Sequence, residues 1–186
     1  MKKIAFIVLV LGVILSFMSC SANRKVVRID SNEVVDLSGR WNDTDSRLVS
    51  SNMIQDLLSG RWILNYESAH GGKLPVVVVG TVLNKSHEHI DAETFIKDIE
   101  KAILDHGSVR LVQAGAKREE LRAEREDQNK GYVSLETAKR WGRELGADFM
   151  LQGTINSIVD TYKKNKVVSY QINLELTDLE TSEIVW

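Results

Sequence analysis

The sequence is poor in cysteine and proline, and it has no excess of basic residues. Its 186 residues include a single cysteine and a single proline. One cysteine cannot form an internal disulfide, so packing must stabilise the fold. The 26 acidic residues outnumber the 24 basic ones, for a formal net charge of −2 at pH 7. This balance makes nucleic acids and anionic lipid surfaces poor candidates as partners.

Motifs that indicate catalysis are also missing. The sequence has neither a Gly-x-Ser-x-Gly nucleophile elbow nor a Ser-x-x-Lys pair. Gly71-Gly72 lacks the spacing of a phosphate-binding loop. The acids from Glu119 to Glu126 lie among arginines, whereas a glycosidase needs one desolvated carboxylic acid. We therefore predict no enzymatic activity, no catalytic residues, no cofactor and no small-molecule substrate.

One segment, His87-Glu88-His89, has ligand-type side chains. Two imidazoles two residues apart share a face only on an extended segment, and a third ligand would have to come from a distant residue such as His70 or His106. A polar loop between a strand and a helix accounts for the same residues. We therefore predict that the chain has no metal site.

What the sequence does have is one long apolar run, at its start. Lys2 and Lys3 precede an uncharged stretch over residues 4–18, the pattern of a secretory signal that is short for a permanent membrane span. Phe17-Met18-Ser19-Cys20 then resembles the bacterial lipobox, although Phe17 replaces the usual Leu. In a lipobox the cysteine sulfur receives a diacylglyceryl group and becomes the first residue of the mature protein. The alternative is an ordinary signal or anchor with an unmodified cysteine.

These features predict three parts of the chain. Residues 1–19 are expected to form a lipoprotein signal peptide, residues 20–33 a tether lipidated at Cys20, and residues 34–186 a globular domain. Several acyl chains on Cys20 would anchor the protein stably. Resemblance to bacterial lipoproteins implies that an Asp directly after the cysteine retains such proteins in the inner membrane. Ser21 at that position favours the outer membrane, with the domain on the periplasmic side.

Hydrophobic spacing predicts an α/β domain. Helices are expected from Asp45-Ser46 to Gly60, from Asp91 to Gly107, over the charged residues 117–130, and from Ser134 to Gly146. Strands are expected over residues 76–83, 109–112, 147–162 and 168–177, with Lys163 to Lys166 at a hairpin tip. This order predicts a mixed β-sheet of about four to five strands with helices packed on it, in a single domain. Ile184-Val185-Trp186 begin a further strand, so we expect either a truncated chain or a short final strand.

The segment before the first helix is the best candidate for a partner surface. It brings aromatic, amide, acidic and basic side chains together, as protein interfaces do. The candidate residues are Arg40, Trp41, Asn42, Asp43, Asp45 and Arg47. The alternative is a structural one, in which similar Ser-Gly-Arg-Trp turns at residues 38–41 and 59–62 lead into and out of the helix. Asp43, Thr44 or Asp45 would then be its cap.

The same segment carries a family resemblance. Residues 37–58, 76–84, 95–104, 146–153 and 178–186 resemble the LpoB-like outer-membrane lipoproteins, which activate peptidoglycan synthases. The resemblance implies a non-enzymatic protein that binds a bifunctional, class A penicillin-binding protein and raises its output. Two features depart from it. The family usually continues past Trp186, and its best-known members have a long flexible tether, whereas the stretch of about 17 residues that follows Cys20 here, 21–37, spans at most roughly 60 Å. A structural or assembly lipoprotein of an envelope or secretion complex is the alternative function.

Overall fold

The structure, a computed structural model, describes residues 28–30, 33–36, 38–130 and 144–186. The chain divides into Met1–Val34 and Val35–Trp186, and all helices and strands described below belong to the second unit. Cys20 and almost all of the helix predicted from Ser134 to Gly146 lie outside the described residues.

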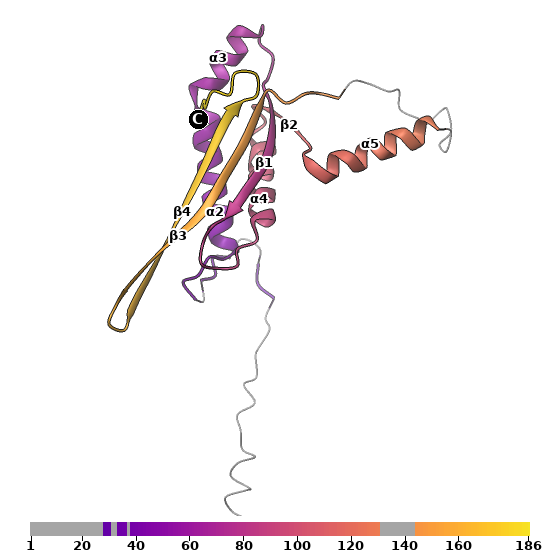
Figure 1. Cartoon of the computed structure of the whole chain (residues 1–186). Coiled ribbons are helices and arrows are strands. Elements are labelled where there is room, and N and C mark those ends of the chain that lie inside the picture. Colours follow the sequence, from indigo (N-terminus) through magenta and orange to yellow (C-terminus); the bar gives the residue numbers. More distant parts are fainter. Residues whose placement is uncertain (1–27, 31–32, 37, 131–143) are drawn as a thin grey trace, which may run out of the picture. The chain divides into compact units, whose positions relative to one another are not determined.

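The described elements confirm the predicted fold class, a single α/β domain with a mixed sheet (Figure 1). Along the chain they are α2 (Asp43–Ser59), α3 (Arg61–Ala69), β1 (Val76–Asn84), α4 (Ala92–His106), β2 (Arg110–Val112), α5 (Gly115–Asn129), β3 (Phe149–Tyr162) and β4 (Asn165–Asp178).

The four strands form one sheet in the order β2-β1-β3-β4. β1 runs parallel to β2 and β3, and β3 runs antiparallel to β4. All four valines from Val76 to Val79 are buried, which confirms for the first half of β1 the prediction that this strand is covered on both faces. In its second half the prediction is wrong, because Thr81 and Leu83 are exposed. β4 alternates between more and less buried side chains, from Val168 to Leu176, as its period of two predicts.

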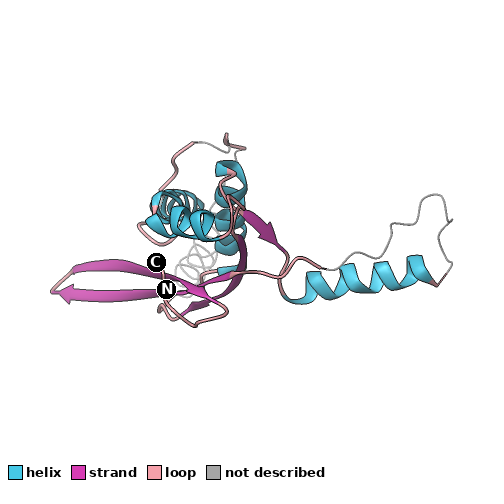
Figure 2. Ribbon diagram, turned by 90° about the horizontal axis from the view of Figure 1, so that it is seen from above, coloured by secondary structure: helices cyan, strands magenta, loops and turns pink. Residues whose placement is uncertain are grey.

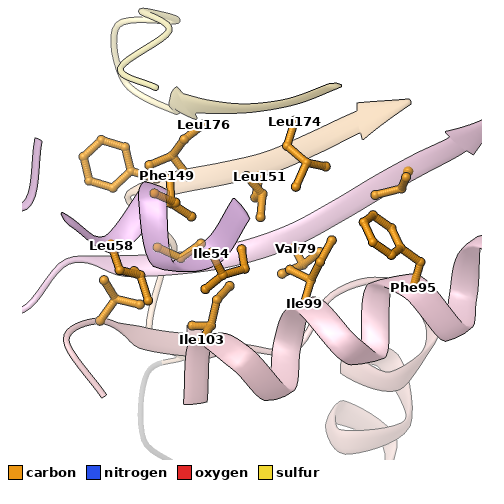
Figure 3. Close-up of a cluster of buried hydrophobic side chains, with 14 of the residues drawn as sticks. Ile54, Leu58, Val79, Phe95, Ile99, Ile103, Phe149, Leu151, Leu174 and Leu176 are labelled. Carbon is orange, nitrogen blue, oxygen red and sulfur yellow. The ribbon is translucent and has the colours of Figure 1, made fainter. Parts of the chain in front are cut away.

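The core lies between one face of the sheet and the helices. α4 packs against α2 and β1, and α2 and α4 lie side by side over the sheet (Figures 1 and 2). Phe95, Ile99 and Ile103 have no exposed surface, because the helical stripe that carries them faces the strands (Figure 3). Leu151 on β3 and Leu176 on β4, also fully buried, meet them from the sheet.

Local capping signals explain the bounds of α4. Asp91 accepts hydrogen bonds from the backbone N–H groups of Glu93 and Thr94, at 2.9 and 3.3 Å. Gly107 ends the helix with a φ of +74°, a left-handed conformation that favours glycine. Both ends confirm the sequence prediction. The charged helix α5 is confirmed too, with nearly all of its described side chains exposed.

The end of α2 at Gly60 is also confirmed, but the chain then enters α3 directly, a helix that the sequence analysis missed. The second Ser-Gly-Arg-Trp motif, at residues 59–62, therefore connects two helices and is not a turn after a single helix. Trp62 is buried, and its indole Nε1 donates to the carbonyl of Leu57 at 2.8 Å across the junction. Trp62 also lies edge-on to Phe149, with 5.0 Å between ring centroids, which ties α3 to the sheet.

The C-terminal residues differ from the strand predicted there. Ile184 forms a single bridge with Thr177, and Leu176 exchanges backbone hydrogen bonds with Val185 and Trp186 at 2.8 and 2.7 Å. These few bonds place the segment along the edge of β4 but do not form a regular strand. The described sheet therefore has four strands and not five.

Candidate functional site

The residues predicted as a partner surface lie at the start of α2, where several of them have structural roles. The side chain of Asn42 accepts hydrogen bonds from the N–H groups of Thr44 and Asp45, at 2.8 and 3.2 Å. Asp45 in turn accepts from the N–H of Asn42 at 3.0 Å, which completes a capping box. The helix cap is therefore Asn42, and the prediction of Asp43, Thr44 or Asp45 as the cap is wrong.

Trp41 is a partly buried anchor of this segment. Its ring lies edge-on to Phe95 of α4 and to Tyr170 of β4, with 5.9 and 5.5 Å between centroids. Its backbone N–H donates to the phenolic oxygen of Tyr170 at 2.9 Å. These contacts hold the segment ahead of α2 against both layers of the domain.

Tyr170 extends this contact to a third segment. Its hydroxyl donates to Oε2 of Glu88, at 2.8 Å, in the loop between β1 and α4. Burial, and then the hydrogen bond to Glu88, raise the pKa of Tyr170 above its usual value. The sequence analysis placed Tyr170 on the packed face of its strand but assigned it no partner.

Three predicted surface residues stay available to a partner. Arg40 and Asp43 are exposed, and Arg47 is partly exposed. Arg47 donates to a carboxylate oxygen of Asp43 at 2.9 Å, an i,i+4 pair on the surface of α2. The structure thus divides the predicted surface into the cap residues Asn42 and Asp45, the anchor Trp41, and an exposed charged group.

The His87–His89 segment is a loop, as the sequence predicts. Its members have different contacts: the backbone N–H and Nδ1 of His87 lie 2.9 and 3.0 Å from Oγ of Ser157, and Glu88 contacts Tyr170. Within the described residues, no group of three or more His, Cys, Asp or Glu side chains is arranged to hold a metal ion.

A second polar cluster joins α3 to the sheet. Tyr66 donates to Oδ2 of Asp148 at 2.7 Å, and the same oxygen accepts from the N–H of Val76 at 2.8 Å. Burial, and then the hydrogen bond and charge of Asp148, raise the pKa of Tyr66 to about 12. An open groove of about 550 Å³ lies beside Tyr66, with His70 and Trp186 among its lining residues. The hydrogen bonds of Tyr66 and Asp148 are thus internal to the fold.

The hairpin of β3 and β4 is the feature that the sequence analysis left without a function. The two strands pair from Phe149–Asp178 to Tyr162–Asn165, whereas β1 pairs with β3 only as far as Ile155. Residues 156–171, here called the arm, therefore extend beyond the pairing with β1 (Figure 1). Lys163 and Lys164 form the predicted turn at its end.

Two general properties bear on the setting of this domain. Among the residues that the structure describes, no helix combines the length and the apolar character needed to cross a bilayer. Every buried side-chain nitrogen and oxygen in the same residues has a hydrogen-bond partner. The buried polar groups are thus engaged within the fold.

Comparison with known proteins supplies the family. Residues 45–186 match the family model described as peptidoglycan-synthase activator LpoB. No curated protein matches the sequence significantly.

Similar solved structures include the C-terminal domain of LpoB from Salmonella enterica, at 14% identity and a TM-score of 0.43, covering 76% of this chain and 93% of that one. The LpoB C-terminal domain from Escherichia coli has 17% identity and a TM-score of 0.36, over 60% and 77% of the two chains. The lipoprotein GNA1162 from Neisseria meningitidis has 14% identity and a TM-score of 0.37, over the same shares. Because the family model spans the folded domain from within α2 to Trp186, the chain belongs to the LpoB family of peptidoglycan-synthase activators.

Proposed function

We propose that this protein is a non-enzymatic, lipid-anchored regulator that binds and activates a bifunctional, class A penicillin-binding protein. Residues 1–19 are its signal peptide, residues 20–33 its tether, and residues 34–186 its binding domain. Acylation of Cys20 holds it at the outer membrane, facing the periplasm. The match of residues 45–186 to a family of synthase activators carries this proposal.

Activation sets a thermodynamic condition on the binding. A regulator without catalytic groups raises the rate of a synthase only if it binds the active conformation more tightly than the inactive one. The complex must therefore contain contacts that the inactive synthase lacks. Two members of the predicted partner surface, Arg40 and Asp43, are exposed, and Arg47 is partly exposed. We propose that these three residues contribute to those contacts.

The test uses the full, acylated chain in detergent together with a purified class A synthase from the same organism. We expect the two proteins to bind and the rate of glycan polymerisation to rise. Binding with an unchanged rate would contradict activation, and absence of binding would contradict the proposal as a whole. Capture of envelope or secretion-pore components in place of a synthase would favour the structural role.

A matched variant separates the anchor from the binding domain. Cys20→Ser removes the acylated sulfur and changes no residue of the folded unit. This variant is expected to leave the outer-membrane fraction in cells but to bind and activate the purified synthase as the wild type does. Retention of Cys20→Ser in the outer-membrane fraction would contradict the role of Cys20.

A further inference from the structure

The arm presents an unpaired strand edge. β1 ends at Asn84, opposite Ile155, and from Asn156 to Tyr162 the only described strand that pairs with β3 is β4. The loop that follows β1 reaches the arm only at its base, where His87 contacts the side chain of Ser157. Beyond Ser157, the edge of β3 that β1 occupies upstream has no partner in the described part of the chain.

Hydrogen bonds at the base of the arm show which backbone groups point outward. The carbonyl of Ile155 accepts from the N–H of Lys85, 2.8 Å away, on the side of β1. Because backbone direction alternates with a period of two, the N–H and C=O groups of Val159 and Thr161 point to the same side. At the other edge of the hairpin, the N–H and C=O groups of Leu176 point away from β3, because they bond to the C-terminal segment. Val168 lies an even number of residues from Leu176, so its backbone groups also point outward from β4. Val168 is the residue that pairs with Val159.

Several large apolar side chains of the arm are exposed. Tyr162 is 70% exposed, Ile158 62% and Val167 60%. Exposed strands with free edges usually carry prolines or several charges, which block pairing with other chains. Between Ser157 and Tyr162 the strand has no proline and a single charge, on Asp160.

The end of the arm is cationic on an otherwise acidic chain. The arm has three lysines at its end and a single acidic residue, Asp160. The three are here called the lysine tip: Lys163, Lys164 and Lys166. Such a tip favours an acidic partner. An anionic membrane suits the arm less well, because Ile158 and Val159 point to opposite faces of the ribbon, so one membrane plane cannot cover both.

We propose that the arm binds an extended, acidic segment of the peptidoglycan synthase, which adds as a strand to the free edge of β3 at Val159 and Thr161. Backbone hydrogen bonds to the two residues hold the segment, and its acidic side chains lie near the lysine tip. This mode is β-strand addition, in which main-chain bonds give affinity and side chains give specificity. The inference rests on the proposed function for the identity of the partner.

A pair of proline substitutions tests the edge. Val159→Pro removes an outward N–H from the edge of β3, and Val168→Pro removes the equivalent N–H from the opposite edge. Neither change removes a hydrogen bond between β3 and β4, so the two variants are matched in their effect on the hairpin. We expect Val159→Pro to weaken synthase binding about tenfold or more, and Val168→Pro to stay within about twofold of the wild type.

The outcomes are distinct. Loss of binding in Val159→Pro alone supports the inference, and equal binding by both variants, or loss in Val168→Pro alone, overturns it. Equal loss in both, with unchanged unfolding midpoints, also overturns the assignment to the β3 edge. Failure of the wild type to bind any class A synthase overturns the proposed function together with this inference.

The lysine tip has its own test. Lys164→Glu reverses a charge at the tip, and Lys73→Glu reverses one at another exposed position. We expect only Lys164→Glu to weaken synthase binding and to reduce its dependence on salt. Binding of the wild type to vesicles rich in anionic lipid, lost in Lys164→Glu while synthase binding is retained, would assign the tip to the membrane and overturn the inference.

Discussion

The hydroxyl of Tyr170 on β4 donates a hydrogen bond to Oε2 of Glu88, 2.8 Å away, in the loop that follows β1. The phenolic oxygen of Tyr170 also accepts a hydrogen bond from the backbone N–H of Trp41, at 2.9 Å. One phenol thus joins a strand, a loop and the segment ahead of α2. Tyr170 also marks the base of the arm, where it pairs with Ser157 on β3.

This arrangement predicts the effect of Tyr170→Phe. The substitution leaves the ring contacts but removes the partner of the Trp41 N–H and of Glu88. Because both groups are only partly buried, the two losses together destabilise the fold by about 1–3 kcal/mol. We expect the free energy of unfolding in urea to fall by about that amount. Tyr162→Phe is the matched control, because Tyr162 is 70% exposed. Equal stability of the two variants would show that the Tyr170 hydroxyl has no structural role.

The capping box predicts a separate effect at Asn42, the residue that follows Trp41. Asn42→Ala removes the acceptor of the Thr44 and Asp45 N–H groups, and loss of such a cap lowers stability by about 1 kcal/mol. Asp43→Ala should have a smaller effect, about 0.3–0.5 kcal/mol. It removes a surface ion pair with Arg47 and a first-turn acid, but alanine has the higher helix propensity. Urea unfolding of both variants measures the difference. A larger loss in Asp43→Ala would contradict the assignment of Asn42 as the cap.

Elements with local signals were predictable from the sequence. The bounds of α4 follow from Asp91 and Gly107, which act through neighbouring backbone groups. The burial of β4 follows from the alternation that ends at Leu174 and Leu176. In each case the residues that define the element lie within a few positions of one another, so the linear pattern contains the information.

Elements without a local signal were not predictable. α3 begins at Arg61, directly after Gly60, which has no side chain to cap a helix, and its start depends on Trp62 packing against Phe149. The cap of α2 was misassigned because Asn and Asp are both good caps, and only the structure distinguishes Asn42 from its neighbours. The contact of Trp41 with Tyr170 spans 129 residues of sequence, and no short-range pattern encodes it.

The Tyr66–Asp148 contact predicts a dependence of stability on pH. The pKa of Tyr66 is raised from 10.0 to about 12 in the folded protein, so between these values the folded state keeps a proton that the unfolded state releases. The contribution of Tyr66 is therefore complete below pH 10 and is lost as the pH rises toward 12. We expect the free energy of unfolding to fall more steeply between pH 10 and about 12 in the wild type than in Tyr66→Phe. Parallel curves for the two proteins would contradict the assignment.

Gly153 on β3 predicts a large effect from a small substitution. A Cβ atom built at this position would lie 2.2 Å from the carbonyl oxygen of Asn173 and 2.5 Å from Cδ2 of Leu174. The first of these atoms belongs to the backbone of β4, so the paired strands themselves must shift to admit a methyl group. Overpacking of this kind destabilises proteins by about 1–3 kcal/mol.

We therefore expect Gly153→Ala to lower the free energy of unfolding by about 1–3 kcal/mol. Gly146→Ala is the control, because a Cβ at that position would meet no atom within 4 Å. Since Gly153 lies where β3 is paired on both sides, the strain would pass to β1 as well as to β4. Amide hydrogen exchange should then show faster opening of both strands in Gly153→Ala and no change in Gly146→Ala. Unchanged exchange in Gly153→Ala would contradict the close approach of the two backbones.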